Sequence, residues 1–157
     1  MAVFQHGIIP AAAATSADPV VEQSLRFEDG DTPSLERTVT SAGSSRKFTI
    51  SLWAKRGKLG ALTPLFSAAA SGYEDILLFN SDDTLILHAR SGNDFSVQTS
   101  AKYRDTSAFY HIVVSIDTEQ STASDRLKIY VNGTLQSYTG TPTEDYDYTA
   151  FNAAETH

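Results

Sequence analysis

The chain has 157 residues, a length typical of one domain and sufficient to bury a hydrophobic core without disulfides. Its 12 basic and 19 acidic residues give a net charge of −7, which disfavours binding to nucleic acid and to anionic membranes. The absence of cysteine excludes disulfides, thiolate metal sites and cysteine nucleophiles. No apolar run approaches the roughly 18 residues of a transmembrane helix, so we expect no membrane insertion.

Residues 1–22 differ from the rest of the chain because they are rich in alanine and nearly uncharged. The lack of a basic start, and the interruption of the apolar stretch by His6 and Pro10, argue against a secretory signal peptide. We predict an extended N-terminal arm over 1–22 and a β-sandwich over 23–157, with a disordered terminus as the alternative. Three apolar side chains of the arm are candidate contacts with a partner chain: Phe4, Ile8 and Ile9.

Short alternating segments separated by polar turns follow the arm. Phe48–Leu52 alternates apolar and polar residues with the period of two that indicates a half-buried strand. Tyr73–Asn80 and Thr84–His88 flank residues with turn chemistry, which predicts a hairpin. Asp94–Thr99 alternates more weakly and is predicted to form a further short strand.

Two stronger strands come next in the chain. Phe109–Asp117 places four apolar side chains on one face, and Leu127–Val131 alternates in the same way. Asn132-Gly133 then predicts a type I′ turn, with Thr134–Tyr138 as the returning strand. Since no segment shows a helical period, the sequence predicts an all-β, antiparallel jelly-roll sandwich.

The C-terminal part does not provide a closing strand. Thr141–Tyr148 is acidic and rich in tyrosine, and an antiparallel sandwich that ended there would expose a sheet edge. We therefore expect the domain to be truncated at its C-terminal end, or its remaining strands to come from elsewhere. Tyr138, Tyr146 and Tyr148 either form a contact surface or pack beneath missing strands.

Three motifs, in matching order and spacing, resemble one known family. Phe48–Lys55 is similar to the F-T-I-S-x-W-x-K strand of laminin-G-like, concanavalin A-like lectin/glucanase jelly rolls. Phe109–Asp117 resembles the W-H-x-V-x-x-x-D strand of that family, with Phe-Tyr in place of the usual Trp. Leu127–Gly133 resembles its L-x-L-Y-V-N-G hairpin. The resemblance implies a laminin-G-type jelly roll, in which a further strand pair normally follows this hairpin.

The start of the domain resembles a subgroup of the family. Ser24–Asp31 and Ser34–Thr38 are similar to the opening of such domains in bacteriophage virion proteins, especially fibre and tail proteins of marine phages. Ala54–Gly60 and Leu65–Ala68 fit the same subgroup. This resemblance implies a virion structural protein (a tail fibre, head fibre or capsid-decorating protein) that displays a lectin-like domain to glycans of the host surface.

The same resemblance implies partners and a location. We expect residues 1–22 to contact other virion proteins in the particle, and the chain to form a homo-oligomer, with a trimer expected by analogy. The alternative is a free carbohydrate-binding adhesin that is extracellular or lies on a cell surface.

Trp53, the only tryptophan, is the first candidate for glycan contact because aromatic faces pack on the apolar faces of sugars. Its strand places it on the face of Thr49, Ser51 and Lys55. The alternative, implied by the family, is a packing role in the sandwich core. Tyr73 and Asn93 are the other candidate glycan contacts.

Acidic residues supply the candidates for metal binding. Asp82 and Asp83 are candidate Ca²⁺ ligands, with a turn stabilised by Asx hydrogen bonds as the alternative. Otherwise we expect no cofactor. The second acidic cluster is interpreted as a solvated loop: Glu144, Asp145 and Asp147.

Catalytic carboxylates are not expected. Glucanases of this fold carry Glu-x-Asp-x-x-Glu on one strand, because an acid and a nucleophile must flank one glycosidic bond. That run is absent, and the adjacent pairs Glu28-Asp29 and Glu74-Asp75 would point to opposite faces of a strand. We therefore predict that the protein is not an enzyme, with a glycoside hydrolase as the least favoured alternative.

Overall fold

The computed structural model describes residues 25–27, 30, 34–70, 73–90, 95–151 and 153–154, with only the backbone of Ala70 and Tyr73. The chain divides into two compact units, residues 1–35 and residues 36–157. The described residues of the first unit contain no helix or strand. The second unit contains the β-structure described below.

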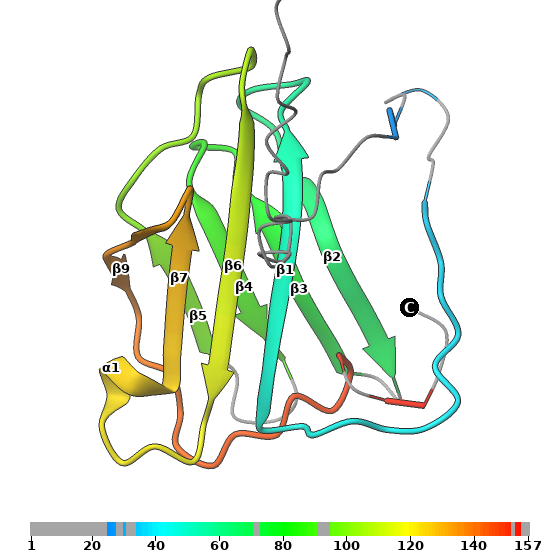
Figure 1. The fold of residues 1–157 in the computed structure, drawn as a ribbon, viewed down its shortest axis with the longest axis vertical. Coiled ribbons are helices and arrows are strands. Elements are labelled where there is room, and N and C mark those ends of the chain that lie inside the picture. Colours follow the sequence, from blue (N-terminus) through cyan, green and yellow to red (C-terminus); the bar gives the residue numbers. More distant parts are fainter. Residues whose placement is uncertain are drawn as a thin grey trace, which may run out of the picture. The chain divides into compact units, whose positions relative to one another are not determined.

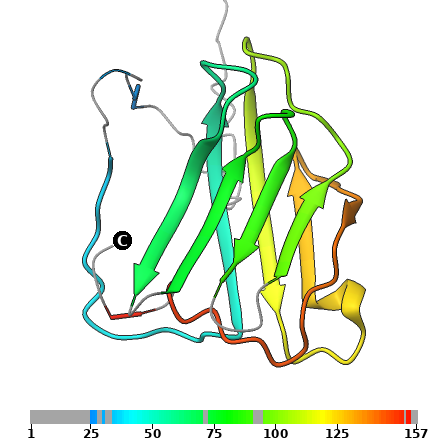
Figure 2. The same cartoon turned by 180° about the vertical axis from the view of Figure 1, so that it is seen from behind.

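The second unit is built from two antiparallel sheets packed face to face (Figure 1). The first sheet has the order β1-β6-β7-β8, with β1 at Lys47–Lys55, β6 at Phe109–Asp117, β7 at Leu127–Val131 and β8 at Thr134–Leu135. The second sheet, seen from behind in Figure 2, has the order β2-β3-β4-β5-β9. Its strands are β2 at Thr63–Ala70, β3 at Tyr73–Phe79, β4 at Leu85–Ala89, β5 at Phe95–Thr99 and β9 at Tyr138–Thr139. The prediction of an all-β antiparallel sandwich is confirmed.

The hydrophobic core lies between the sheets and follows from the alternation in the sequence. In β6, every second residue is buried, while the intervening residues are partly or fully exposed. β1 turns Phe48, Ile50 and Leu52 toward this core. Each fully buried aliphatic side chain contributes roughly 1.5–3 kcal/mol by leaving water. Several such side chains from both sheets form the centre of the core: Leu77, Leu85, Leu87, Val97, Ile112, Val114 and Ile129.

The Asn-Gly hairpin forms as predicted, but its returning strand is short. Asn132 and Gly133 have φ values of 50° and 78°, the left-handed conformations that a type I′ turn requires. The prediction of one strand over Thr134–Tyr138 is wrong. The chain leaves the first sheet after Leu135 and crosses to the second, where Tyr138 pairs with Thr99. There the Tyr138 hydroxyl donates a hydrogen bond to the Leu127 carbonyl oxygen at 2.9 Å, so this side chain joins the two layers.

Two elements were not predicted. β2 contains Pro64 and consecutive alanines, and its pairing with β3 shifts register between Pro64 and Phe66. An edge position accommodates both features, because one side of an edge strand needs no hydrogen-bonding partner. The four-residue helix α1, Ala123–Arg126, interrupts the polar loop between β6 and β7.

Residues 141–151 cross the end of the sandwich at which β1 begins and β6 ends (Figure 1). Tyr146, Tyr148 and Phe151 are buried in the core, so the tyrosines of this segment pack and the contact-surface alternative is wrong for them. Arg46 binds both carboxylate oxygens of Asp147 at 2.9 and 3.0 Å. An irregular segment thus supplies apolar side chains to a core that was expected to need further strands.

The acidic residues of this segment are not simply solvated. Asp145 pairs with Arg46 at 2.9 Å, and Glu144 pairs with the buried guanidinium of Arg126. The backbone is held as well, because Tyr148 N–H donates to the Ser45 carbonyl oxygen at 2.9 Å. Glu144 and Asp145 remain exposed, as the solvated-loop interpretation expects. Their ion pairs, together with that of Asp147, nevertheless join this segment to Arg46, which precedes β1, and to Arg126 of α1.

Candidate functional site

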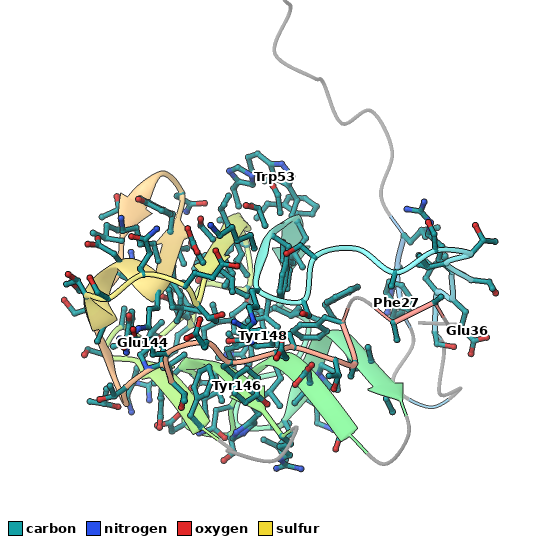
Figure 3. All side chains as sticks on the ribbon, turned by 90° about the horizontal axis from the view of Figure 1, so that it is seen from below. Phe27, Glu36, Trp53, Glu144, Tyr146 and Tyr148 are labelled. Atoms are coloured by element: carbon teal, nitrogen blue, oxygen red, sulfur yellow. The ribbon has the colours of Figure 1, made fainter. Side chains whose placement is uncertain are left out.

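Trp53 lies on the outer face of the first sheet and is 55% exposed. Its predicted placement opposite the inward-facing side chains of β1 is confirmed, and the core-packing alternative is wrong. Figure 3 shows Trp53 projecting away from the interior in which Tyr146 and Tyr148 lie. An exposed indole on a rigid strand is a ready contact surface for a ligand.

The ring of His111 supports one face of the indole. Trp53 and His111 are directly paired across β1 and β6, and their rings stack with centroids 4.6 Å apart and planes 17° apart. The Nε2 atom of His111 lies 3.2 Å from Ser51 Oγ, within hydrogen-bonding distance. β1 is the edge strand of its sheet, so no strand of the described residues flanks Trp53 on the side away from His111.

The hairpin turn fixes the backbone of His111. Its N–H donates to Asn132 Oδ1 at 2.8 Å, and its carbonyl oxygen accepts a hydrogen bond from Asn132 N–H at 2.8 Å. The Asn-Gly turn that the sequence indicated therefore positions the ring under Trp53. The hairpin turn at Asn132 thus helps to form the candidate site at Trp53, although these residues are far apart in the sequence.

Further exposed side chains share this outer face. Leu135 of β8 is 57% exposed and lies opposite Tyr130 of β7. Tyr130 lies opposite Val113 of β6, and Val113 lies opposite Ser51 of β1. Phe109 is also exposed, and the Lys55 ammonium lies 5.9 Å from its ring centroid. We call the surface formed by six of these residues the outer-face platform: Ser51, Trp53, His111, Val113, Tyr130 and Leu135.

Most of the other predicted contact residues lie outside the described residues. This holds for Asn93 and for the three arm residues Phe4, Ile8 and Ile9. Tyr73 begins β3, but its side chain is not among those described. The roles of these residues therefore stay predictions.

Asp83 accepts hydrogen bonds from three protein groups. They come from the backbone N–H of Gly60 at 3.0 Å, from Arg56 at 2.9 Å and from Arg104 at 2.9 Å. The Gly60 hydrogen bond, aided by the two arginines, lowers the pKa of Asp83 to about 2. The carboxylate is buried, and the guanidinium of Arg56 lies over the Phe79 ring.

Asp82 is also engaged by protein donors. Its carboxylate accepts hydrogen bonds from the Thr84 hydroxyl at 2.6 Å and from Gln98 Nε2 at 2.9 Å, and the Thr84 contact lowers its pKa. Among the described residues, no group of three or more histidine or acidic side chains is arranged to hold a metal ion. The geometry is that of a turn closed by Asx hydrogen bonds. Sequence reasoning missed the buried Arg56, since an arginine that follows a lysine at the end of a strand reads as solvent-exposed.

The adjacent acidic pair of β3 is split between environments. Glu74 is exposed and lies 3.3 Å from Arg90 Nη1. Asp75 is fully buried and accepts hydrogen bonds from the backbone N–H groups of Arg90 and Phe151. The two carboxylates lie on opposite faces of the strand, as predicted, and cannot flank one glycosidic bond.

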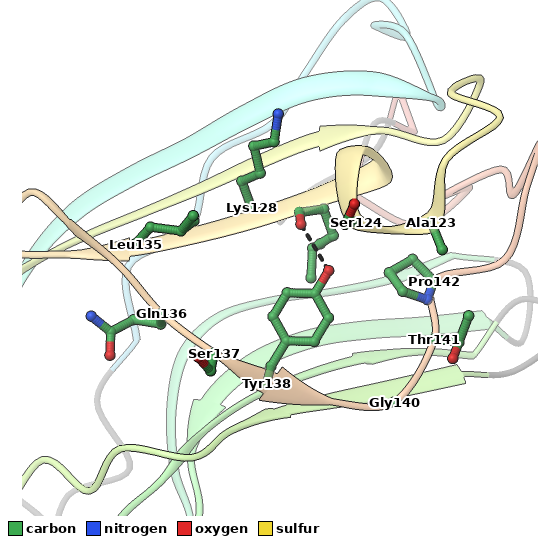
Figure 4. A pocket seen from close by; sticks show the side chains of 11 residues that line it. Ala123, Ser124, Lys128, Leu135, Gln136, Ser137, Tyr138, Gly140, Thr141 and Pro142 are labelled. Carbon is green, nitrogen blue, oxygen red and sulfur yellow. Dashed lines mark hydrogen bonds between the residues drawn. The ribbon is translucent and has the colours of Figure 1, made fainter.

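A groove of about 350 Å³ lies at the edge where β7 and α1 face β9. Tyr138 lies within it, and its hydroxyl is directed at the Leu127 carbonyl oxygen (Figure 4). Lys128, which lines the same groove, pairs with Asp125 at 3.0 Å. Protein partners thus engage both the Tyr138 hydroxyl and the Lys128 ammonium of this groove.

The two packed antiparallel sheets define a lectin-like β-sandwich protein. The family model of the concanavalin A-like lectin/glucanases superfamily matches residues 29–154, and the chain belongs to this superfamily. No curated protein and no solved structure matches the chain. Within the described residues, no helix has the length and apolar character needed to cross a membrane.

Proposed function

We propose that this protein is a non-catalytic carbohydrate-binding domain and that Trp53 is its principal ligand contact. The observation that carries the proposal is the exposed indole held in place by His111. Sugar rings present C–H-rich faces that pack against aromatic rings, while their hydroxyl groups seek polar partners. Ser51 and His111 supply such partners beside the indole.

A hydrolytic role is disfavoured by the state of the carboxylates. Glu74 and Asp75 face opposite sides of β3, and Asp83 is neutralised by two arginines. A retaining or inverting glycosidase needs one protonated and one ionised carboxyl group facing a shared bond. A depressed pKa at Asp83 makes that group a poor general acid.

For the biological setting, we propose a phage virion protein in which residues 1–22 bind other virion proteins and the sandwich faces the host surface. The support is the resemblance of Ser24–Asp31 and Ser34–Thr38 to virion domains. Native mass and light scattering, with and without residues 1–21, test this setting. An oligomer, expected to be a trimer, that requires the arm supports it. A monomer unaffected by the deletion favours the free adhesin.

A glycan array tests carbohydrate binding. Trp53→Ala should lower binding at least tenfold and change the melting temperature little, since the side chain is half exposed. Leu62→Ala is the matched control, because Leu62 is 64% exposed and lies outside the outer-face platform. Equal binding by Trp53→Ala and wild-type protein would overturn the proposal.

A further inference from the structure

The outer-face platform carries a second aromatic side chain, two strands away from Trp53. Tyr130 on β7 pairs with Val113 on β6, and Val113 pairs with Ser51 on β1. Ser51 and Trp53 are two residues apart on β1, so all four side chains share one face. Within the described residues, the Tyr130 hydroxyl makes no hydrogen bond, and so it is available to a ligand.

The spacing of the two aromatic residues follows from sheet geometry. Trp53 and Tyr130 are separated by two strand spacings of about 4.8 Å and by two residues of about 3.3 Å, so their Cα atoms lie roughly 12 Å apart. One pyranose ring is too small to cover both. A ligand that contacts both must therefore be a chain of several sugar rings running obliquely across the strands.

The surface between the two aromatics combines one polar pair with one apolar side chain. The Ser51–His111 pair supplies hydrogen-bonding atoms beside Trp53, and Val113 supplies an apolar step toward Tyr130. Leu135, paired with Tyr130 and exposed, extends the apolar surface at the far end. One polar step beside Trp53 is thus followed by a longer apolar and aromatic stretch from Val113 through Tyr130 to Leu135, a surface on which further sugar rings could pack.

We propose that the outer-face platform binds a linear oligosaccharide of at least three rings, with one ring on Trp53 and a later ring on Tyr130. This inference rests on the proposed carbohydrate-binding function and adds the ligand class and a second contact residue. A domain that recognised a single terminal sugar would need only the Trp53 end.

The test measures affinity against ligand length. The probes are cello-, xylo- and chito-oligosaccharides of one to six units, and the readout is the fluorescence of Trp53, the sole tryptophan. We expect the affinity of at least one series to rise about tenfold or more between one and four rings. Tyr130→Thr, which retains a β-forming residue, should abolish this rise and leave the affinity for the single sugar unchanged.

Lys128→Gln is the control, because Lys128 lies two residues from Tyr130 on the same strand and the same face. The Lys128→Gln variant should retain the length dependence.

An affinity that is independent of ligand length, or a length dependence that is unchanged in Tyr130→Thr, would overturn the inference and leave the proposed carbohydrate binding intact. A Trp53 signal that no series changes would overturn the proposed function and this inference with it. If Tyr130→Thr lowers the oligomeric mass and not the affinity for glycan, the face is instead an interface between copies of the chain, which also overturns the inference.

Discussion

Gly140→Ala is expected to be among the most damaging single-methyl additions to this protein. Gly140 directly follows β9 and begins the chain's path toward the buried Tyr146 and Tyr148. Its φ of +94° is one that residues with a side chain rarely adopt. A Cβ placed there would lie 2.1 Å from the Ser96 carbonyl oxygen, with two further backbone atoms at 3.2 and 3.3 Å.

The expected cost has two parts. The left-handed conformation costs an alanine roughly 1–2 kcal/mol. Ordinary contact begins at 3.4 Å, so the Ser96 oxygen would have to move by 3.4 − 2.1 = 1.3 Å. Ser96 is paired with His88 in the second sheet and cannot move alone, so overpacking adds about 1–3 kcal/mol. The free energy of unfolding should fall by about 2–5 kcal/mol, which at about 3 °C per kcal/mol lowers the melting temperature by about 6–15 °C.

Thermal unfolding followed by far-ultraviolet circular dichroism measures this effect. Gly57→Ala is the control, because a Cβ at Gly57 meets no atom within 4 Å and φ there is not left-handed. The reasoning is refuted if the melting temperatures of Gly140→Ala and Gly57→Ala agree within about 1 °C. Such a result would mean that β9 and the carbonyl of Ser96 separate at little cost.

Three further predictions concern buried polar groups. Tyr148→Phe should raise the free energy of unfolding, measured by urea titration, by about 1 kcal/mol. The reason is that the Tyr148 hydroxyl is buried without a hydrogen-bonding partner in the described part of the chain. A loss of stability would contradict this. The pKa of Asp83 falls from 3.8 to about 2 on folding, so its stabilising effect is present above pH 3.8 and is lost as the pH falls toward 2. The stability deficit of Asp83→Asn should therefore be largest near neutral pH and shrink near pH 2, and a deficit independent of pH would argue against this. Millimolar Ca²⁺ should leave the melting temperature unchanged, because protein donors engage the carboxylates of Asp82 and Asp83. A rise would show instead that Ca²⁺ binds the folded protein.

The features that were predictable from sequence are those fixed by local patterns. Alternation in Phe109–Asp117 identified the inward face of β6, and the alternation of β1 placed Trp53 on the outer face. Asn132-Gly133 fixed the turn, because few dipeptides tolerate two consecutive left-handed residues. The superfamily was predictable because the motifs of β1, of β6 and of the β7 hairpin occur in the order and spacing typical of that family.

Features determined by distant contacts were not predictable. The apolar character of Tyr146 and Tyr148 was visible, but their place in the core depends on the bonds of Arg46 to Asp145 and Asp147, about a hundred residues away. The crossing of Tyr138 to the second sheet depends on a hydrogen bond to Leu127. The stacking of His111 on Trp53 depends on the register of β1 with β6. No local signal encodes any of these pairings.

The edges of the two sheets bear on how the protein would assemble. β1 ends in Lys47 and Lys55, whose charges oppose the addition of another strand. β2 carries Pro64 and a shift of register, which disturb the regular hydrogen-bonding edge that an added strand needs. At the opposite edges, β8 and β9 have two residues each, too few to template a partner strand. Pairing between sheet edges is therefore a poor route to the proposed oligomer. The proposed assembly through residues 1–22 does not require pairing between these edges.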